Sequence, residues 1–264
     1  MAVTVLAVSI LLALSLTGII SQAEALKLFV VIELPLILAA LGITVLRLRR
    51  IAQEAALQQR RFRDHLVAVE PLAGPAVYEF TAYASLVALL ARRLYVPAGA
   101  TPFGYTKGTL SIPIALVVAS LIEAVAVHFL IPWVWLRIVL LIVTAWGIVF
   151  LAGVIAMKIV YPHYLSGDTL YLRYGAREVA QVPLASIAQV QQRPNYAHTQ
   201  VAIDGEAVVL TQFHSTNVRV SLNRPCSAAP PLPKKKLPAG FQAREFLLYV
   251  EDPEEFVTAV AAER

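Results

Sequence analysis

The chain has 264 residues, of which 58% are hydrophobic and only 15% are charged. Its mean hydropathy is +0.69, whereas an average soluble domain is about 45–50% apolar and about 25% charged. These values exclude a purely soluble globular protein. The single cysteine, Cys226, excludes an internal disulfide framework and a multi-cysteine zinc site. The net charge of +5 is typical of a membrane protein whose loop charges set its topology.

Four apolar segments are long enough to cross a bilayer. They are residues 3–20, 28–46, 110–133 and 134–157. At 1.5 Å per residue, such segments span roughly 27–36 Å, against a hydrocarbon core of about 30 Å. Backbone polar groups in lipid need internal partners, so each segment is predicted to be a helix. The sequence therefore predicts a four-helix membrane bundle built from two hairpins, within residues 1–46 and 110–160.

Basic residues between the two hairpins indicate the orientation. They are Arg47, Arg49, Arg50, Arg60, Arg61, Arg63, Arg92, Arg93 and Lys107. The opposite side holds only Lys27 and Arg137. The positive-inside rule places residues 47–109 and both termini in the cytosol. We expect a multi-pass protein of the cell membrane, with the lipid bilayer as its first partner.

The first segment has a second interpretation. Residues 23–25 read Ala-Glu-Ala, which resembles a signal-peptidase site after an apolar run. However, no Lys or Arg precedes that run, and the run is long for a signal peptide. An uncleaved helix and a cleaved signal both stay open, and the rest of the topology is the same in either case.

Residues 47–109 are predicted to form a basic cytosolic loop that contains helices. The second membrane helix is expected to continue from residue 48 to 66. Residues 76–91 form a second apolar stretch, too short to span and basic on both flanks, which predicts an interfacial or core-buried helix. Arg92 and Arg93 at its end are candidate contacts for anionic lipid, or simply a solvated helix end. Residues 97–109, rich in Pro, Gly and Thr, are predicted to be a loop.

In residues 161–264 the apolar period changes to two, which predicts a β domain. Strands are expected at 169–174, 178–182, 187–192, 200–203, 207–212, 218–222 and 245–250. Asp204-Gly205 is a hairpin signal. Asp252-Pro253 predicts the start of a terminal helix with one apolar face. We therefore expect a small barrel or sandwich with this helix over an open end.

A Pro-rich insertion, residues 225–240, is predicted to be a flexible loop, with Cys226 as an exposed bystander. It carries three consecutive lysines, Lys234, Lys235 and Lys236. These lysines are candidate contacts for anionic lipid. Equally, they could only keep the loop soluble.

Several stretches resemble a known group of proteins. They include RRLYVPAGATPFGYTKG, SLIEAVAVHFLIP, YLRYGAREVAQVPLASIAQV, STNVRVSLNRP and VEDPEEFVTAV. Together with the β domain that follows a membrane helix through YPHYLSGDTLYLRYG, they resemble uncharacterised multi-pass membrane proteins of high-GC Gram-positive bacteria with a C-terminal bacterial PH-like domain. The resemblance covers most of residues 60–260. It implies an architecture and no chemistry, because PH-like folds serve unrelated functions.

Four polar side chains fall inside the predicted membrane segments. Glu33, Glu123, His128 and Arg137 lie roughly 5–14 Å below the outer surface, counted in helical rise. Lone charges in a bilayer are unfavourable by about 2.5–3.5 kcal/mol, so paired ones are preferred. We expect a cluster in which Arg137 pairs with Glu33 or Glu123, with His128 nearby. A structural ion pair, snorkelling to the interface and a functional proton, ion or metal site all stay open.

Two functions remain. No GxSxG, P-loop, GxGxxG or CxxC motif is present, so no enzyme activity, cofactor or metal is assigned. Residues 158–264 hold 11 basic and 10 acidic residues, which argues against nucleic-acid binding. We favour a scaffold whose PH-like module receives a protein or peptide at a strand edge or the Pro-rich loop. The alternative is a small transporter or membrane enzyme that uses the intramembrane cluster. The oligomeric state stays open, a homo-oligomer included.

Overall fold

A computed structural model of the chain describes residues 73–233, 236–238 and 240–263. Before residue 73 it describes residues 21, 24, 27, 31, 43, 46, 47, 49–54, 66, 69 and 70. The chain divides into two compact units, Met1–Val77 and Tyr78–Arg264. Predicted segment 3–20 lies outside the described residues, as does most of 28–46. The first hairpin therefore stays a prediction.

A capping box marks one helix start in the first unit. The Ser21 hydroxyl accepts a hydrogen bond from the Glu24 N–H at 3.2 Å, and the Glu24 carboxylate accepts from the Ser21 N–H at 2.9 Å. This reciprocal pair satisfies two backbone donors that have no partner within the helix. The described positions from residue 24 to residue 54 are all helical.

Helix α4 (Gly74–Leu90) confirms the helix predicted over residues 76–91. It ends in a Schellman motif, in which the Arg93 N–H donates to the Ala88 carbonyl and the Arg92 N–H donates to the Leu89 carbonyl. Arg92 takes the left-handed conformation that this motif requires, with φ +53°. Glycine usually occupies that position, so the sequence pattern alone gives no sign of this cap.

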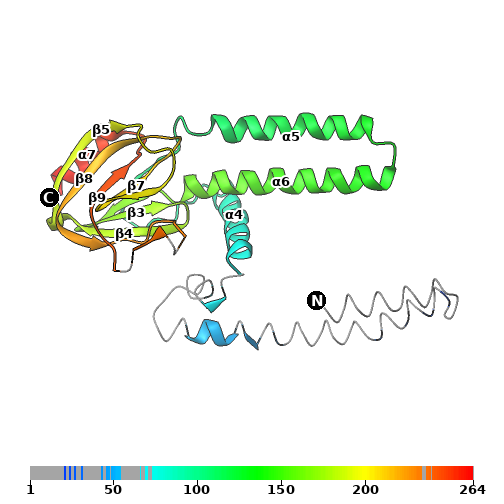
Figure 1. Cartoon of the computed structure of the whole chain (residues 1–264), viewed down its shortest axis with the longest axis horizontal. Helices are drawn as coiled ribbons and strands as arrows, with labels where there is room; N and C mark the ends of the chain where they lie inside the picture. Colours follow the sequence, from blue (N-terminus) through cyan, green and yellow to red (C-terminus); the bar gives the residue numbers. More distant parts are fainter. Residues whose placement is uncertain are drawn as a thin grey trace. The chain divides into compact units, whose positions relative to one another are not determined.

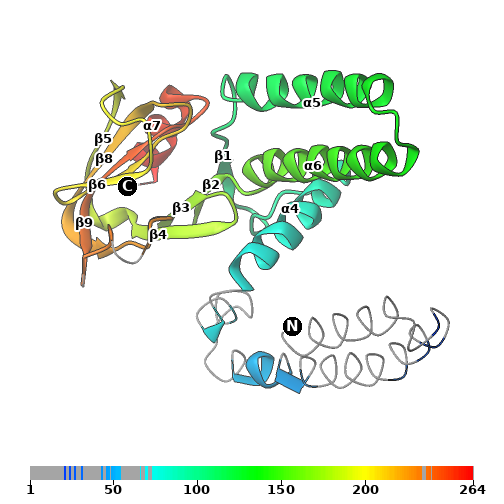
Figure 2. The same cartoon turned by 45° about the vertical axis from the view of Figure 1, so that its right-hand side comes forward.

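Helices α5 (Ser111–Leu130) and α6 (Val134–Val160) are long and apolar enough to cross a membrane. They run side by side in opposite directions and are joined at the end away from the β domain (Figures 1 and 2). No residue of α5 is buried. In α6 the buried residues lie only in the last two turns, at Gly153, Ala156, Met157 and Val160. The second predicted hairpin is therefore present as two apolar helices.

The C-terminal region is mostly β structure, in two sheets. The first is antiparallel, in the order β1 (Thr101–Phe103), β2 (His163–Ser166), β3 (Thr169–Tyr174), β4 (Arg177–Pro183). A 3-10 turn, Leu184–Ser186, leads to the second sheet. Its order is β5 (Ile187–Asn195), β8 (Thr216–Ser227), β9 (Gln242–Leu248), β7 (Ala207–Leu210), β6 (Ala202–Asp204), with β7 and β9 parallel.

One hydrophobic core joins the two sheets to helix α7 (Pro253–Ala262). Leu170 and Leu172 of β3 and Phe246 of β9 are fully buried in it. Phe256 and Val260 of α7 complete the core, because both have 0% exposure. The spacing of two along the strands and of four along the helix places these side chains on one face of each element.

Two turn predictions in the β domain are confirmed. The Asp252 carboxylate caps α7 by accepting from the Glu255 N–H at 3.0 Å, and Pro253 begins the helix. Gly205 and Glu206 join β6 to β7 as an antiparallel hairpin that Asp204 closes by pairing with Ala207, so the turn lies one residue later than the predicted Asp204-Gly205; Gly205 has φ +59°. The positive φ explains why glycine is suited to this place.

The strand count was wrong: nine strands form among the described residues, not seven. Strand β1 lies within residues 97–109, which were predicted to be a loop, and β2 follows α6 directly. Both are too short to show a period of two. In addition, β8 runs through Ser227 into the predicted 225–240 loop, so Cys226 is half-buried in a strand and is not an exposed loop residue.

Candidate functional site

The predicted intramembrane cluster is not assembled by the described residues. Glu123 and His128 are exposed on α5. Arg137 donates a hydrogen bond from Nη1 to the His128 carbonyl at 3.3 Å, a favourable place for a cation because it is a helix C-terminus. Among the described residues no ion pair joins Arg137 to Glu123. Glu33 lies outside the described residues, so its pairing with Arg137 stays a prediction.

The predicted lipid contacts are described only in part. Arg92 and Arg93 are exposed and follow α4 directly. The Tyr95 N–H donates to the carbonyl of Val160, the last residue of α6, at 2.8 Å, so both arginines lie near the end of the hairpin. Lys236 is exposed. Lys234 and Lys235 lie outside the described residues.

The junction between α6 and the β domain holds a buried polar cluster that the sequence did not reveal. Only Tyr161 and Pro162 separate α6 from β2. The Tyr105 hydroxyl donates to the Tyr161 carbonyl at 3.1 Å and accepts from the Gly175 N–H at 2.9 Å. Tyr105 has 0% exposure, and burial raises the pKa of its phenol. It therefore acts as a neutral buried connector between α6 and the turn after β3.

His163, the first residue of β2, lies beside Tyr105, with ring centroids 4.9 Å apart. Its Nδ1 accepts from the Arg173 backbone N–H at 2.9 Å. Burial, helped by the positive charge of Arg173, lowers the pKa of this imidazole from 6.5 to about 3. The ring is therefore neutral at physiological pH and, because Nδ1 accepts, carries its proton on Nε2.

Arg173 of β3 is the buried cation of this junction, with 5% exposure. Its guanidinium lies over the rings of Tyr164 and Tyr161, at 4.4 and 5.7 Å from their centroids. Nη1 donates to the Tyr95 carbonyl at 2.5 Å, and Tyr95 stacks on Tyr161 at 4.6 Å. Aromatic faces and a carbonyl thus stabilise the charge where water is excluded.

A second connection holds the segment that leads into α5. Glu251, which follows β9, accepts through Oε1 from the Thr106 N–H, the Thr106 hydroxyl and the Lys107 N–H at 2.9, 2.9 and 3.1 Å. The Tyr249 hydroxyl donates to the Lys107 carbonyl at 2.9 Å. A Cβ on Gly104 would lie 2.6 Å from the Glu251 carboxyl carbon, so a side chain here would displace this carboxylate. We call residues 104–107 the strap.

Helix α4 packs across α6 through small residues. A Cβ on Gly153 would lie 2.8 Å from the backbone of Ala82, so the two helices are in direct backbone contact. Beside this crossing, the Tyr83 hydroxyl donates to Glu79 Oε1 at 2.6 Å. Trp146 Nε1 donates to the same carboxylate oxygen at 3.1 Å and also to the Tyr83 hydroxyl. Glu79 stands in no recognisable motif in the sequence.

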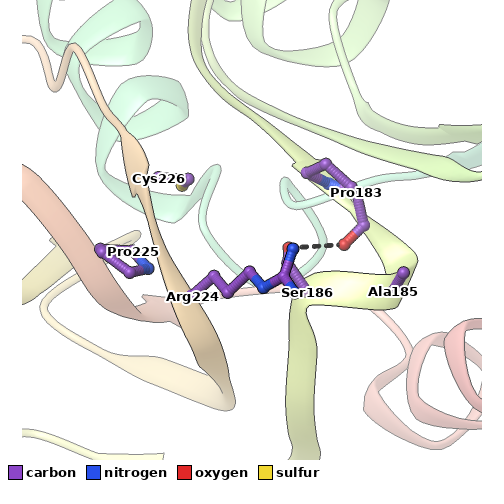
Figure 3. Close-up of a pocket in the computed structure, with 6 residues that line it drawn as sticks. All are labelled: Pro183, Ala185, Ser186, Arg224, Pro225 and Cys226. Carbon is purple, nitrogen blue, oxygen red and sulfur yellow. Dashed lines mark hydrogen bonds between the residues drawn. The ribbon is translucent and has the colours of Figure 1, made fainter.

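One pocket, of about 290 Å³, lies in the β domain between the turn after β4 and the far half of β8. Pro183, Ala185, Ser186, Arg224, Pro225 and Cys226 line it, and Figure 3 shows the Arg224 side chain reaching toward Ser186. The Ser186 hydroxyl donates to the Pro183 carbonyl at 2.7 Å, and burial raises the pKa of the Cys226 thiol to about 11. A protonated thiol is a poor nucleophile. The residues that line this pocket therefore include a cation that could bind a ligand, Arg224, but no activated nucleophile.

The buried polar residues described above link structural elements to one another. Tyr105 and Glu251 join the roots of the α5–α6 hairpin to the β domain, and Arg173 joins β3 to Tyr161 after α6 and to Tyr95 after α4. Within the described part of the chain, no group of three or more His, Cys, Asp or Glu side chains could hold a metal ion. Comparison of the chain with known protein families, curated proteins and solved structures finds no match.

Proposed function

We propose that the chain is a multi-pass membrane protein that presents its β domain as a binding or scaffolding module at the cytosolic face of the cell membrane. The observation that carries this proposal is the exposed apolar hairpin. Ile122, Phe129 and Trp135 are 66%, 80% and 67% exposed. Exposure of apolar surface to water is unfavourable by about 25 cal/mol per Å². A bilayer around the hairpin removes that penalty.

The distribution of charge supports the cytosolic orientation. Arg92, Arg93, Lys107 and Lys158 all lie at the end of the hairpin that carries the β domain, whereas Arg137 lies near the other end. Basic residues are enriched in short cytoplasmic loops. The β domain would therefore face the cytosol.

The two connections at the hairpin roots support a presenting role. Helix α6 runs into β2 almost without a linker, and the strap before α5 is fixed to Glu251. A flexible tether would need neither connection. The β domain is held in a defined orientation to the hairpin, and such an orientation suits a module that receives a partner at the membrane.

The sheet topology supports a PH-like interpretation of the β domain. Strands β2, β3 and β4 form one meander, β5, β8 and β9 form another, and α7 covers the core between them. The β6–β7 hairpin is an addition to this plan, because it lies between β5 and β8 in sequence and pairs parallel with β9. The proposal concerns architecture, since PH-like folds have many ligands.

Strand β5 is the best place for a peptide partner. It lies at the edge of its sheet. With nine residues it is longer than β4, the edge strand of the other sheet, which has seven. Along β4, the other long outer strand, the Ala229 N–H already donates to the Val179 carbonyl. An extended peptide could add to β5 through main-chain hydrogen bonds.

The alternative of a transporter or membrane enzyme has less support. Such a protein needs its polar groups to converge on a cavity or pathway. Glu123 and His128 are exposed, and within the described ranges neither pairs with the side chain of Arg137. We therefore keep the scaffold as the single proposed function.

Proximity labelling in the native cell tests this proposal. A labelling enzyme fused to the C-terminus of the full chain would be compared with the same enzyme fused after residue 160, which leaves the membrane part alone. The proposal predicts a reproducible set of neighbours that only the full chain gives. Identical sets from the two fusions would contradict a binding role of the β domain.

A further inference from the structure

Helix α4 has two different faces. Small residues, Ala82, Ser85 and Ala88, are buried. The opposite face carries Phe80, Val87 and Leu90, which are 74%, 66% and 78% exposed. These positions follow the spacing of one helical face. Ala76 and Ala84 on this face are also exposed, and the half-buried Tyr83, whose hydroxyl donates to Glu79, is the one polar-tipped side chain within it. A mainly apolar exposed face points to an apolar partner.

The lengths of α5 and α6 indicate at what depth along the membrane span α4 lies. Helix α5 has 20 residues, which is about 30 Å and equals the thickness of a hydrocarbon core. Helix α6 runs antiparallel beside it, and the first 20 residues of α6 end at Gly153. Gly153 is where α6 contacts Ala82 of α4. Helix α4 therefore crosses the hairpin at the end of the membrane span nearer the β domain.

The direction of α4 suits that level. In both views α4 crosses the direction of α6 and does not run along it (Figures 1 and 2). If α6 crosses the bilayer, α4 then lies closer to the membrane plane than to the membrane normal. The Gly153–Ala82 contact, the bonds from Tyr83 and Trp146 to Glu79, and the edge-to-face contact of Tyr78 with Phe150 at 6.2 Å hold α4 against α6, from Gly153 to about 10 Å further into the span.

The end of α4 carries the charges that such a position needs. Arg92 and Arg93 follow the last turn and are exposed, and the Schellman motif fixes their backbone. Basic residues next to a buried apolar face bind anionic headgroups while the apolar face enters the acyl chains. The same helix thus has an acyl-chain face and a headgroup end.

We propose that α4 is a membrane-surface helix: it lies in the cytosolic leaflet, with Phe80, Val87 and Leu90 among the acyl chains and Arg92 and Arg93 at the headgroups. This inference rests on the proposed function, because it takes α5 and α6 as the membrane span. Lipid covers the apolar face. Helix α4 is then a third element of the protein that contacts the bilayer, beside α5 and α6.

Spin labels on the full chain in nanodiscs that contain anionic lipid test the proposal. With Cys226 replaced by serine, single cysteines are introduced by Phe80→Cys, Val87→Cys, Val118→Cys and Arg177→Cys. All four positions are exposed, so labels there leave packing intact. We expect the labels at 80 and 87 to collide with oxygen and not with a water-soluble nickel chelate, at a depth of about 5–10 Å. The label at 118 on α5 should lie deeper, and the label at 177 on β4 should lie in water.

Each other outcome has a distinct meaning. Labels at 80 and 87 in water, with 118 in lipid, would overturn the α4 proposal and leave the membrane anchor standing. A label at 118 in water would overturn the anchor itself. Protection at 80 and 87 from both reagents would mean that protein covers this face, either residues 1–72 or a second copy, and would also overturn the proposal. Depths at 80 and 87 that differ by about 10 Å, the rise of seven helical residues, would exclude an in-plane helix.

Discussion

The Glu251 carboxylate oxygen lies 2.9 Å from both the backbone nitrogen and the hydroxyl oxygen of Thr106, a residue 145 positions earlier in the chain. It therefore joins the end of β9 to the segment that enters α5. Through this contact and the direct passage of α6 into β2, both roots of the hairpin are fixed to one β domain. The account of the protein as a membrane-held module depends on these two attachments.

Removal of the Glu251 carboxylate should release the strap. Glu251→Ala leaves two backbone N–H groups and a hydroxyl without their acceptor, a loss of about 1–3 kcal/mol. Glu251→Gln keeps one acceptor oxygen and should have a smaller effect. Hydrogen exchange of the full chain in nanodiscs measures this at the Thr106 and Lys107 amides, which should exchange faster. Glu263→Ala, at an exposed position on the end of α7, serves as the control. Unchanged exchange in Glu251→Ala would contradict the strap.

The two glycines of α6 should respond in opposite ways to alanine. Gly153→Ala places a methyl group 2.8 Å from the Ala82 backbone, and such overpacking is unfavourable by about 1–3 kcal/mol. Gly147→Ala meets nothing within 4 Å and should favour the helix by about 0.5–1 kcal/mol. Emission of Trp146, with Trp133 and Trp135 replaced by phenylalanine, should change only in Gly153→Ala. An equal spectrum in both variants would mean that α4 does not pack at Gly153.

Acid should destabilise the β domain through His163. The pKa of His163 is about 3 in the folded chain and 6.5 when exposed. Below pH 6.5, His163 therefore binds a proton in the unfolded chain but not in the folded chain. The free energy of unfolding then falls by about 1.4 kcal/mol per pH unit until pH approaches about 3.

His163→Asn keeps an acceptor at the Nδ1 position and does not titrate. Between pH 7 and pH 5 this variant should lose about 2 kcal/mol less of the free energy of unfolding than the wild type. Urea unfolding of the full chain in nanodiscs, followed by circular dichroism, gives this difference. His214→Asn, which changes an exposed histidine in a left-handed turn position, should behave as the wild type does. Equal pH dependence in wild type and His163→Asn would contradict the buried neutral imidazole.

Loss of the buried Arg173 charge should loosen the junction. Arg173→Met keeps an unbranched apolar stem in the site but loses the bond to the Tyr95 carbonyl and the contact with the Tyr164 ring. A loss of roughly 2–4 kcal/mol is expected from these two contacts. The stability of Arg173→Lys should lie between that of the wild type and that of Arg173→Met, since lysine keeps the charge without the planar group. Thermal unfolding of the full chain is the measurement. Arg177→Met, on the exposed side of β4, should change little, and a loss as large as that of Arg173→Met would remove the claim for Arg173.

Elements with a long and regular pattern could be predicted from the sequence. Strand β3 has the predicted bounds, 169–174, and the Asp252-Pro253 start of α7 was predicted from its capping residues. Their signals are local: a period of two, or a cap followed by proline. Helices α5 and α6 could also be predicted from a local signal, because a long uninterrupted apolar run is typical of a membrane-spanning helix.

Elements whose structure depends on distant partners could not be predicted. Strand β1 reads only Thr-Pro-Phe, and it is a strand because residues 163–165 pair with it. Tyr105, Arg173 and Glu251 show no motif, since their partners lie 56, 78 and 145 positions away. The predicted pairing of Arg137 with Glu33 or Glu123 was inferred from depth in the membrane alone, and depth does not say which faces meet. No ion pair joins Arg137 to Glu123 among the described residues, and the pairing with Glu33 stays a prediction.

The orientation of the α5–α6 hairpin is the central claim, and accessibility of single cysteines in intact cells tests it most directly. In a Cys226→Ser background, Pro132→Cys lies in the connection between α5 and α6, and Glu254→Cys lies on α7; both positions are exposed. A membrane-impermeant maleimide should label position 132 in intact cells and position 254 only after the membrane is opened. Labelling of position 254 in intact cells, with position 132 protected, would contradict a cytosolic β domain.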